Sequence, residues 1–351
     1  MLKHLKLENF RNHQHLELTL EPITILVGKN GAGKSNIIEA VSVLSFCRPF
    51  REINKQDLIN FSSQFARVSG DDQEIFLSRL PRFFMKAKSK GTSCRLSDFI
   101  GHTPVVVFSP ETLSILSGSP GDRRRFLDIM ISQVDKEYLR ALVDYDKVKK
   151  QRNHLLKRLK RGEGSISELS YWNKELVSQG ALIAIKRDDA ISFINNRIVA
   201  IYRLISEQEG AEISITYQKN YSNFLEDLES ARNQDIAIER TTHGPHRDDL
   251  LTSLNQREMS KFSSRGEMKS AVLALKIVEL QYLELHQDKY STAREKKEPM
   301  LLLDDVFSEF DASRRRQLTG LISKYQSIIT TAEESLLDPE LVKKAKVIRF
   351  K

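Results

Sequence analysis

The residues with the clearest capacity for chemistry form a glycine-rich run near the N-terminus. Residues 28–35 read Gly-Lys-Asn-Gly-Ala-Gly-Lys-Ser and fit the pattern G-x-x-x-x-G-K-[ST]. In such a run, backbone N–H groups surround phosphate oxygens, the lysine reaches the β- and γ-phosphates, and the serine hydroxyl binds Mg²⁺. The sequence therefore predicts a nucleoside triphosphate site that consists of Gly28, Lys29, Asn30, Gly31, Ala32, Gly33, Lys34 and Ser35.

A second motif, at residues 300–305, supplies carboxylates. It reads Met-Leu-Leu-Leu-Asp-Asp, an apolar strand pattern that ends in two acids. We expect this strand to lie beside the phosphate site, with Asp304 holding Mg²⁺ directly or through water. Asp305 is then placed to orient or deprotonate the attacking water, so Asp305 and Lys34 are the predicted catalytic residues. Alone, this pattern is weak evidence, because many ordinary strands end in acids.

The elements that must position these residues can be predicted from local patterns. A β-branched strand at 23–27 precedes the glycine-rich run, and a helix from Gly33 to about Phe46 follows it. Further strands are predicted at 2–7, 16–20, 75–77, 83–87, 105–108, 211–217, 300–304 and 327–331. Helices are predicted over 122–160, around 191–205 and over 263–285, with a turn at 161–165 and an exposed loop at 289–299.

The spacing of the two motifs predicts an interrupted domain. Lys34 and Asp304 are 270 positions apart (304 − 34), a separation that small kinases and GTPases with such a loop do not need. The isoleucines between 191 and 205 recur every three or four residues, which favours an antiparallel helical arm of about 80 residues. We therefore predict an α/β head at 1–121 and 209–351, interrupted by a helical arm at 122–208.

Composition narrows the class of protein. The 351 residues allow about two domains, and 40% hydrophobic residues suffice for a packed core. The sequence contains no apolar run near the roughly 20 residues that a membrane span needs, and no signal-peptide core. Two cysteines, Cys47 and Cys94, make neither a disulfide framework nor a zinc quartet. We expect a cytoplasmic protein with reduced thiols and no membrane partner.

The net charge of +8 is unevenly distributed. Residues 147–161 contain no acid and eight basic residues: Lys147, Lys149, Lys150, Arg152, Lys157, Arg158, Lys160 and Arg161. Such a cluster suits a nucleic-acid backbone, whose counterions are released on binding. The alternative is a solvated helix face without a partner, and the run alone does not decide between them. Arg123, Arg124 and Arg125 form a shorter basic cluster.

Taken in order, the motifs resemble those of the RecF family, in the SMC-like branch of the ABC-type ATPases. The resemblance covers nearly the full length and rests on residues 9–12, 28–35, 107–111, 118–128, 242–249, 264–267 and 303–311. It implies an ABC-type P-loop ATPase head of mixed β-sheet and helices, with an inserted helical arm. It also implies that Ser264, Arg265 and Gly266 are the signature that contacts the γ-phosphate on a second subunit. Glu267 stands where the family usually has glutamine.

Several other residues carry two interpretations. Arg11 and Asn12 resemble family residues near the nucleotide, but they can equally form surface contacts. His243 and His246 have no local acid or cysteine set typical of a metal site, so we interpret them as loop or interface residues. Trp172 is interpreted as part of the core of the arm.

The resemblance implies an ATP-dependent, DNA-binding protein of recombinational repair, replication restart and the SOS response. An ATP-bound head-to-head dimer would clamp double-stranded DNA near gaps and support recombinase loading, with RecO and RecR as partners. Slow, DNA-stimulated hydrolysis of ATP would release it. Three alternatives are an SMC-like nuclease of the overcoming-lysogenisation type, an ABC transporter subunit and a small-molecule kinase. The lack of a further acidic cluster argues against the nuclease, the basic run argues against the transporter subunit, and the separation of the two motifs argues against the kinase.

Overall fold

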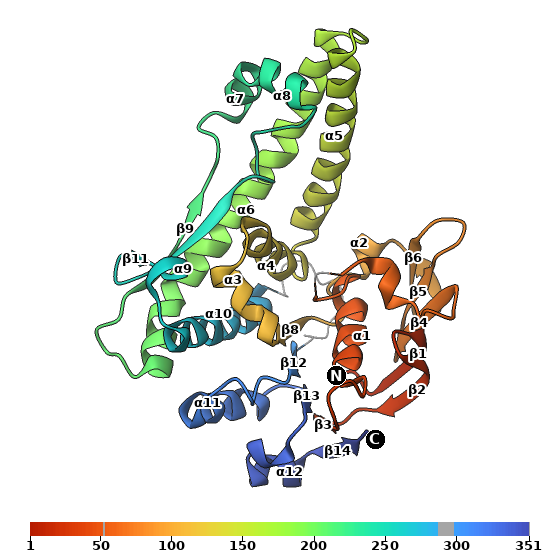
Figure 1. Ribbon diagram of the computed structural model, residues 1–351, viewed down its shortest axis with the longest axis vertical. Helices are drawn as coiled ribbons and strands as arrows, with labels where there is room; N and C mark the ends of the chain where they lie inside the picture. Colours follow the sequence, from red (N-terminus) through yellow and green to blue (C-terminus); the bar gives the residue numbers. More distant parts are fainter. Residues whose placement is uncertain (52, 287–297, 351) are drawn as a thin grey trace. The chain divides into compact units, whose positions relative to one another are not determined.

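The computed structural model describes residues 1–51, 53–286 and 298–350, and the chain divides into two compact units (Figure 1). The first comprises Met1–Leu113 and Val272–Lys351, and the second comprises Ser114–Ala271. Our sequence-based boundaries at 122 and 208 differ from this division, because residues 209–271 pack with the helices. For example, the Asn195 side chain exchanges two 2.8 Å hydrogen bonds with the backbone of Ile215.

A five-stranded parallel sheet forms the centre of the first unit. Its order is β14 (Lys346–Arg349), β3 (Ile23–Val27), β13 (Ser327–Thr331), β12 (Met300–Asp304) and β8 (Val105–Phe108). Because all pairs are parallel, the carboxyl ends of β3 and β12 lie at the same edge of the sheet. The acidic strand is not the direct neighbour of β3, however. Strand β13 lies between them, and the end of the acidic strand still lies beside the glycine-rich loop, as expected.

A six-stranded antiparallel sheet forms the other part of this unit. Its order is β2 (His13–Thr19), β1 (His4–Phe10), β4 (Phe65–Gly70), β5 (Gln73–Ser78), β6 (Phe84–Ser89) and β7 (Thr92–Cys94). Alternate residues such as Leu7, Val68 and Ile75 are fully buried on the face that packs against α1 (Lys34–Phe46). The expected strand alternation is thus present, with one face in the core.

The second unit contains two long helices that lie side by side, α5 (Lys136–Lys160) and α6 (Ile166–Ser206) (Figure 1). A capping box of Ser165 and Glu168 starts α6 directly after the predicted turn. The predicted helix over 122–160 is instead two helices, α4 (Pro120–Ser132) and α5. Asp135 causes the break, because its side chain accepts a 2.9 Å hydrogen bond from the Tyr138 N–H and caps α5.

Shorter elements complete the second unit. These are α3 (Ser114–Ser117), β9 (Ile213–Gln218), α7 (Phe224–Ser230), α8 (Arg232–Ile238), β10 (Asp249–Leu254), β11 (Arg257–Glu258) and α9 (Met259–Phe262). Strands β11, β10 and β9 form an antiparallel sheet in that order. The partly buried ring of Trp172 packs against the cluster of Leu155, Leu156 and Leu169. This contact agrees with the interpretation of Trp172 as part of the core of the arm.

The remaining helices include α10 (Arg265–His286), whose first residues belong to the second unit and whose later residues belong to the first. The others in the first unit are α2 (Leu96–Phe99), α11 (Ala312–Ile322) and α12 (Pro339–Lys344), with 3₁₀ turns at Lys55–Leu58, Pro110–Leu113 and Glu334–Leu336. The loop predicted at 289–299 lies mostly outside the described residues. Within the described ranges, no helix combines the length and the apolar character needed to span a bilayer.

Candidate nucleotide-binding site

The glycine-rich run connects β3 to α1 at the edge of the parallel sheet. Gly31 and Gly33 have φ angles of 87° and 90°, in the left-handed region that favours glycine. A Cβ atom at Gly33 would lie only 2.6 Å from the Asn12 amide, whereas a Cβ at Gly31 would meet nothing within 4 Å. The loop is therefore packed tightly on one side and open at Gly31, and its backbone leads directly into the positive end of α1.

The ammonium group of Lys34 is turned into this loop. It donates hydrogen bonds of 2.5 and 2.8 Å to the carbonyl oxygens of Gly28 and Lys29, and the residue is only 7% exposed. Burial lowers the pKa of Lys34, while the charges of Asp305 and Asp304 oppose that effect. The loop thus holds a cation at the place where the sequence predicts phosphate oxygens.

The two predicted metal ligands are in direct contact. The Ser35 hydroxyl donates a 2.6 Å hydrogen bond to Oδ1 of Asp304, although the two residues are 269 positions apart. The Thr330 hydroxyl, from the intervening strand β13, donates to the same oxygen at 2.8 Å. Because a hydroxyl and a carboxylate are the hard oxygen ligands that Mg²⁺ prefers, this pair fits the predicted ion.

Asp305 follows immediately, with a φ of 51°. Its N–H donates to the Thr330 hydroxyl at 3.0 Å, which fixes the turn after β12. Burial raises the pKa of Asp305, and the neighbouring charge of Asp304 adds to this. The catalytic role of Asp305 stays a prediction, and the direction of its pKa shift suits a base better than an unperturbed carboxylate does.

Arg51 is a site residue that sequence reasoning missed. Its guanidinium lies 2.9 Å from Oδ2 of Asp304 and 3.7 Å from a carboxylate oxygen of Glu111, and it lies 5.1 Å from the centroid of the Phe50 ring. A positive charge therefore already balances the carboxylate assigned to Mg²⁺. The segment around Arg51 has no strand or helix periodicity that would mark it as part of a site. The one related signal in the sequence is the 107–111 motif, which contains its partner Glu111.

Residues 11–13, at the turn between β1 and β2 and the start of β2, contact the loop and α1. Arg11 forms a 2.7 Å ion pair with Glu39, whose side chain is fully buried in α1. Asn12 accepts a hydrogen bond from Asn36, and Nε2 of His13 lies 3.1 Å from the Gly33 carbonyl oxygen. These contacts hold the start of α1 and place Asn12 beside Gly33, so they agree with both interpretations of Arg11 and Asn12.

Comparison with known proteins decides the family. Residues 1–90 match the family model described as the RecF/RecN/SMC N-terminal domain. The DNA replication and repair protein RecF of Lachnoclostridium phytofermentans is 36% identical, over 94% of this chain and 92% of the relative. The RecF of Oenococcus oeni is 32% identical, over 100% of this chain and 98% of the relative. The chain belongs to the RecF family.

Solved structures agree with this membership. Structures of the recombination mediator protein RecF of the RecFOR pathway, one of RecF-ATP and one of RecF-ATPrS, match with TM-scores of 0.85 and 0.84 at 28% identity. Each match covers 96% of this chain, and 93% and 94% of those chains, respectively. An Smc head domain derived from Pyrococcus furiosus matches at a TM-score of 0.51 and 17% identity, covering 99% of this chain and 92% of that one, and shows the shared fold of the head alone.

The segment that the RecF resemblance identifies as the signature begins α10. Ser264 caps this helix: its hydroxyl accepts from the Glu267 N–H at 3.2 Å, and its own N–H donates to the Glu267 carboxylate at 2.7 Å. Glu267 therefore turns back onto Ser264. Ser264 and Arg265 are exposed, and Gly266 is half-buried.

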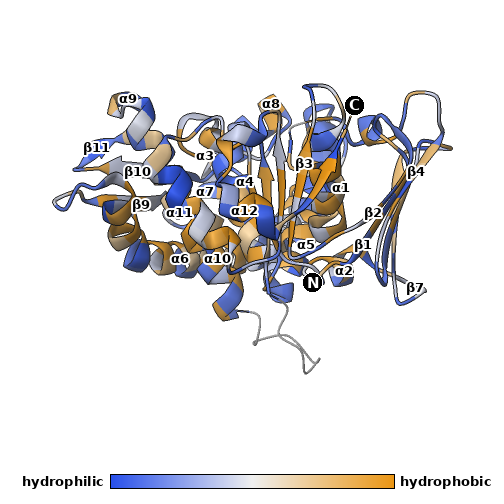
Figure 2. Cartoon of the chain, turned by 90° about the horizontal axis from the view of Figure 1, so that it is seen from below, coloured by the Kyte–Doolittle hydropathy of each residue, from blue (hydrophilic) through white to orange (hydrophobic). Residues whose placement is uncertain are grey.

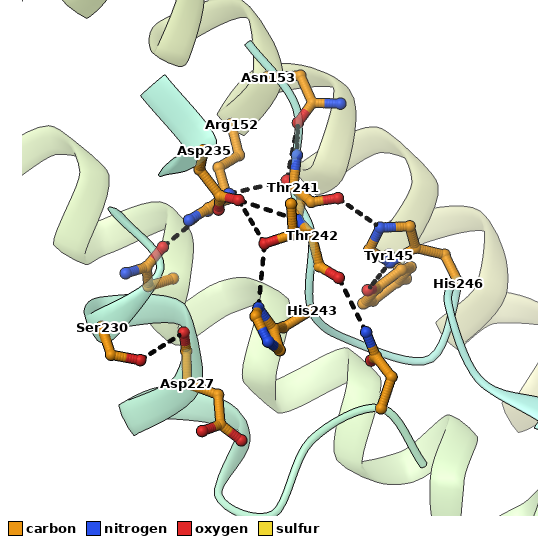
Figure 3. Close-up of polar contacts among 12 residues, drawn as sticks. Tyr145, Arg152, Asn153, Asp227, Ser230, Asp235, Thr241, Thr242, His243 and His246 are labelled. Carbon is orange, nitrogen blue, oxygen red and sulfur yellow. Dashed lines mark hydrogen bonds and ion pairs between the residues drawn. The ribbon is translucent and has the colours of Figure 1, made fainter. Parts of the chain in front are cut away.

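The RecF-type motif at 242–249 has a structural role (Figure 3). Nδ1 of His246 lies 2.7 Å from the Tyr145 hydroxyl, and Nε2 lies 3.1 Å from the Thr241 carbonyl oxygen. Burial lowers the pKa of His246 to about 3, so the ring is neutral. His243 contacts the Thr242 hydroxyl at 3.0 Å. Within the described ranges no group of three or more His, Cys, Asp or Glu could hold a metal ion.

The basic run of 147–161 offers fewer unpaired charges than its sequence suggests. Ion pairs join Lys147 to Asp144, Lys149 and Lys150 to Asp146, Arg158 to Glu168 and Lys160 to Glu239. Arg152 is fully buried with Asp235, so it cannot meet a ligand. Lys157 and Arg161 stay exposed near the end of α5. A local charge of +8 therefore overstates the attraction for a phosphate backbone.

Proposed function

We propose that this RecF-family chain is an ATP-dependent DNA-binding protein of recombinational repair and replication restart. The observation that carries the proposal is the contact between Ser35 and Asp304, 2.6 Å apart at the end of the glycine-rich loop. Together with Lys34 it provides the parts that a triphosphate site requires. The match to RecF-ATP supports ATP as the nucleotide. The exposed cations near the end of α5 suit contacts with DNA phosphates.

In the proposed reaction, Gly28–Ser35 hold the triphosphate through backbone N–H groups, and Lys34 neutralises charge on the β- and γ-phosphates. Ser35 and Asp304 would hold Mg²⁺, which when bound offsets the negative charge on the phosphate oxygens. Asp305 orients a water molecule toward the γ-phosphorus. The water oxygen forms the new P–O bond, ADP leaves, and the proton of the water passes to Asp305.

We further propose that ATP joins two copies of the chain head to head. Ser264, Arg265 and Gly266 of one copy would contact the γ-phosphate held by the other, as the family resemblance implies. The exposure of Ser264 and Arg265 at the start of α10 supports this role. The resulting dimer would clamp duplex DNA near gaps, act with RecO and RecR in the cytoplasm, and support recombinase loading. Loss of the γ-phosphate would then release it.

The proposed contacts with DNA phosphates predict that the affinity for DNA depends strongly on salt concentration. Double-stranded DNA is expected to stimulate slow hydrolysis of ATP, and its affinity should fall steeply as salt rises. Lys157→Gln with Arg161→Gln should lower the slope of log affinity against log salt by about one for each cation that contacts a phosphate. Fluorescence anisotropy with a labelled duplex measures both quantities.

A matched control is Lys149→Gln with Lys150→Gln, on the same helix, because both lysines already pair with Asp146. It should leave the slope nearly unchanged. If DNA leaves turnover unchanged and no duplex binds at low salt, the DNA-binding proposal is wrong.

Ser264→Arg is expected to leave nucleotide binding intact and to prevent ATP-dependent pairing, since a long cation replaces the hydroxyl at the proposed contact. Sedimentation velocity with and without ATP measures pairing, and protection from thermal unfolding by ATP measures binding. Ser165→Arg is the control, because Ser165 caps α6 in the same way and its loss costs about 1 kcal/mol of helix stability without touching the signature. A dimer of the wild type that forms equally well without ATP would contradict the proposal.

A further inference from the structure

Thr330 is a polar residue in a fully buried strand of the parallel sheet. The strands at the centre of this sheet are mainly apolar (Figure 2), and every residue of β13 is buried. Thr330 itself is 1% exposed and follows Ile328 and Ile329, which are completely buried. A hydroxyl at such a position costs free energy unless it is hydrogen-bonded. The partners of this hydroxyl therefore indicate what it does.

The Thr330 hydroxyl joins the two acids of the candidate site. It donates to Oδ1 of Asp304 at 2.8 Å and accepts a hydrogen bond of 3.0 Å from the N–H of Asp305. The direction of both bonds is fixed, because a backbone amide can only donate and the hydroxyl has a single proton. The carbonyl oxygen of Thr330 also accepts from the same N–H, at 3.2 Å. One residue thus sets the position of Asp305 relative to Asp304.

The carboxylate of Asp304 has contacts that do not depend on Thr330. Its Oδ1 accepts a second hydrogen bond, of 2.6 Å, from the Ser35 hydroxyl, and its Oδ2 lies 2.9 Å from the Arg51 guanidinium. These contacts come from the start of α1 and from the segment that follows this helix. Without the Thr330 hydroxyl, Asp304 therefore keeps a partner on each of its oxygens.

The backbone of Asp305 has a conformation that needs support from its surroundings. Its φ of 51° lies in the left-handed region, which residues other than glycine rarely adopt. The Thr330 hydroxyl holds the N–H of Asp305, and the Ser308 hydroxyl donates to the Asp305 carbonyl oxygen at 2.7 Å. Two side-chain hydroxyls thus hold the two peptide groups that flank Asp305, and so they limit where its carboxylate can lie.

We propose that Thr330 is a positioning residue for the hydrolysis of ATP, which fixes Asp305 where its carboxylate can orient the attacking water. The inference rests on the function proposed above, in which Asp305 receives the proton of that water. A carboxylate acts on a water molecule only within hydrogen-bond reach, and a displacement of about 1 Å can cost about a hundredfold in rate. Thr330 therefore affects the chemical step through Asp305, and it takes no part in binding the nucleotide.

Thr330→Val removes the hydroxyl and keeps a side chain of similar shape. Single-turnover hydrolysis of ATP, with duplex DNA present, should be about tenfold to a hundredfold slower than in the wild type. The affinity for a fluorescent ATP analogue in Mg²⁺ should stay within about threefold, because Ser35 and Lys34 keep their contacts. Thr330→Ser retains the hydroxyl and should restore the rate to within a few-fold of the wild type.

Thr24→Val is the matched control for the loss of a buried hydroxyl. Thr24 lies near the start of the neighbouring strand β3 and is fully buried. Its hydroxyl also makes two hydrogen bonds, since it accepts from the Glu21 N–H at 3.0 Å and donates to the Glu21 carbonyl oxygen at 3.3 Å. Thermal unfolding should show similar losses of stability for the two valine variants, whereas Thr24→Val should hydrolyse ATP as the wild type does.

A double-mutant cycle decides whether Thr330 acts through Asp305. Asp305→Asn removes the carboxylate, so adding Thr330→Val to it should slow hydrolysis by less than about twofold more. Effects of the two variants that multiply would overturn the proposal, as would a wild-type rate in Thr330→Val while Asp305→Asn is slow. A wild-type rate in Asp305→Asn would instead show that the hydrolysis proposed above does not use this carboxylate, and the role of Thr330 would fall with it.

Discussion

Replacement of Lys34 by methionine is expected to lower ATP turnover at least about a hundredfold, the usual scale when one group that stabilises transition-state charge is removed. Methionine keeps an unbranched apolar stem of similar length but carries no charge. The Lys34 ammonium is the cation that the glycine-rich loop holds at its centre, bonded to two loop carbonyl oxygens. Without it, charge that develops on the γ-phosphate has no counterpart from this loop. ATP-dependent dimerisation should be lost as well. Phosphate release and sedimentation in ATP measure the two effects.

The matched control for this variant is Lys29→Met, in the same loop. Lys29 is exposed, and its role in the loop is carried by its carbonyl oxygen, which the substitution retains. It should keep turnover within a few-fold of the wild type. Wild-type turnover in the Lys34→Met protein would show that the triphosphate is not held by residues 28–35.

The local structure around the candidate site follows from short-range geometry that the sequence predicts. The left-handed φ angles of Gly31 and Gly33 and the helix that starts at Lys34 all follow from one eight-residue pattern. The parallel sheet then brings Asp304 to Ser35, because Asp304 ends β12, Ser35 follows β3 and the loop, and both strands end at the same edge. The insertion of β13, and with it Thr330, depends on the order of strands in the sheet. No local pattern encodes that order.

The contacts of the charged residues show where sequence reasoning fails. The partners of Lys147, Lys149 and Lys150 lie three or four residues earlier on the same helix, so they could have been predicted from helical spacing. The partners of Arg51 and Arg152 are 253 and 83 positions away. Pairing over such distances depends on the complete fold. A count of charges in a sequence window cannot separate a buried arginine from one that meets a ligand.

The boundaries of the insert were less predictable for a related reason. Helical periodicity marks the two long helices, but it gives no sign that β9, β10 and the 242–249 motif pack with them. That motif contributes Pro245, whose carbonyl oxygen accepts a 2.8 Å hydrogen bond from Arg187 of α6. Arg187 also pairs with Asp128 of α4 at 2.9 Å. Two motifs that the family resemblance identifies, 118–128 and 242–249, are thus joined through one buried arginine.

The second large effect is expected from Asp235→Ala, which should destabilise the second unit by about 3–5 kcal/mol. Arg152 and Asp235 are both fully buried and form a 2.7 Å ion pair. Arg152 also donates to Asn173 and Thr241, and Asp235 accepts from the backbone and the hydroxyl of Thr242 (Figure 3). Removing the carboxylate leaves a charged guanidinium in the core, and burial, which lowers the pKa of Arg152, cannot neutralise it at ordinary pH.

Urea denaturation followed by tryptophan fluorescence measures this change, since Trp172 lies on α6 beside the Leu155 and Leu156 cluster. Arg158→Met is the control: its pair with Glu168 spans 3.6 Å at a half-exposed position, so its loss should cost less than about 1 kcal/mol.

The double variant Arg152→Met with Asp235→Leu should recover part of the stability lost in Asp235→Ala, because it removes both charges together. A midpoint for Asp235→Ala equal to that of the wild type would mean that water or another acid reaches Arg152 and that the pair does not hold α5 to α8. If the double variant is as unstable as Asp235→Ala, hydrogen bonds to Asn173, Thr241 and Thr242, rather than the buried charge, determine the stability of this region.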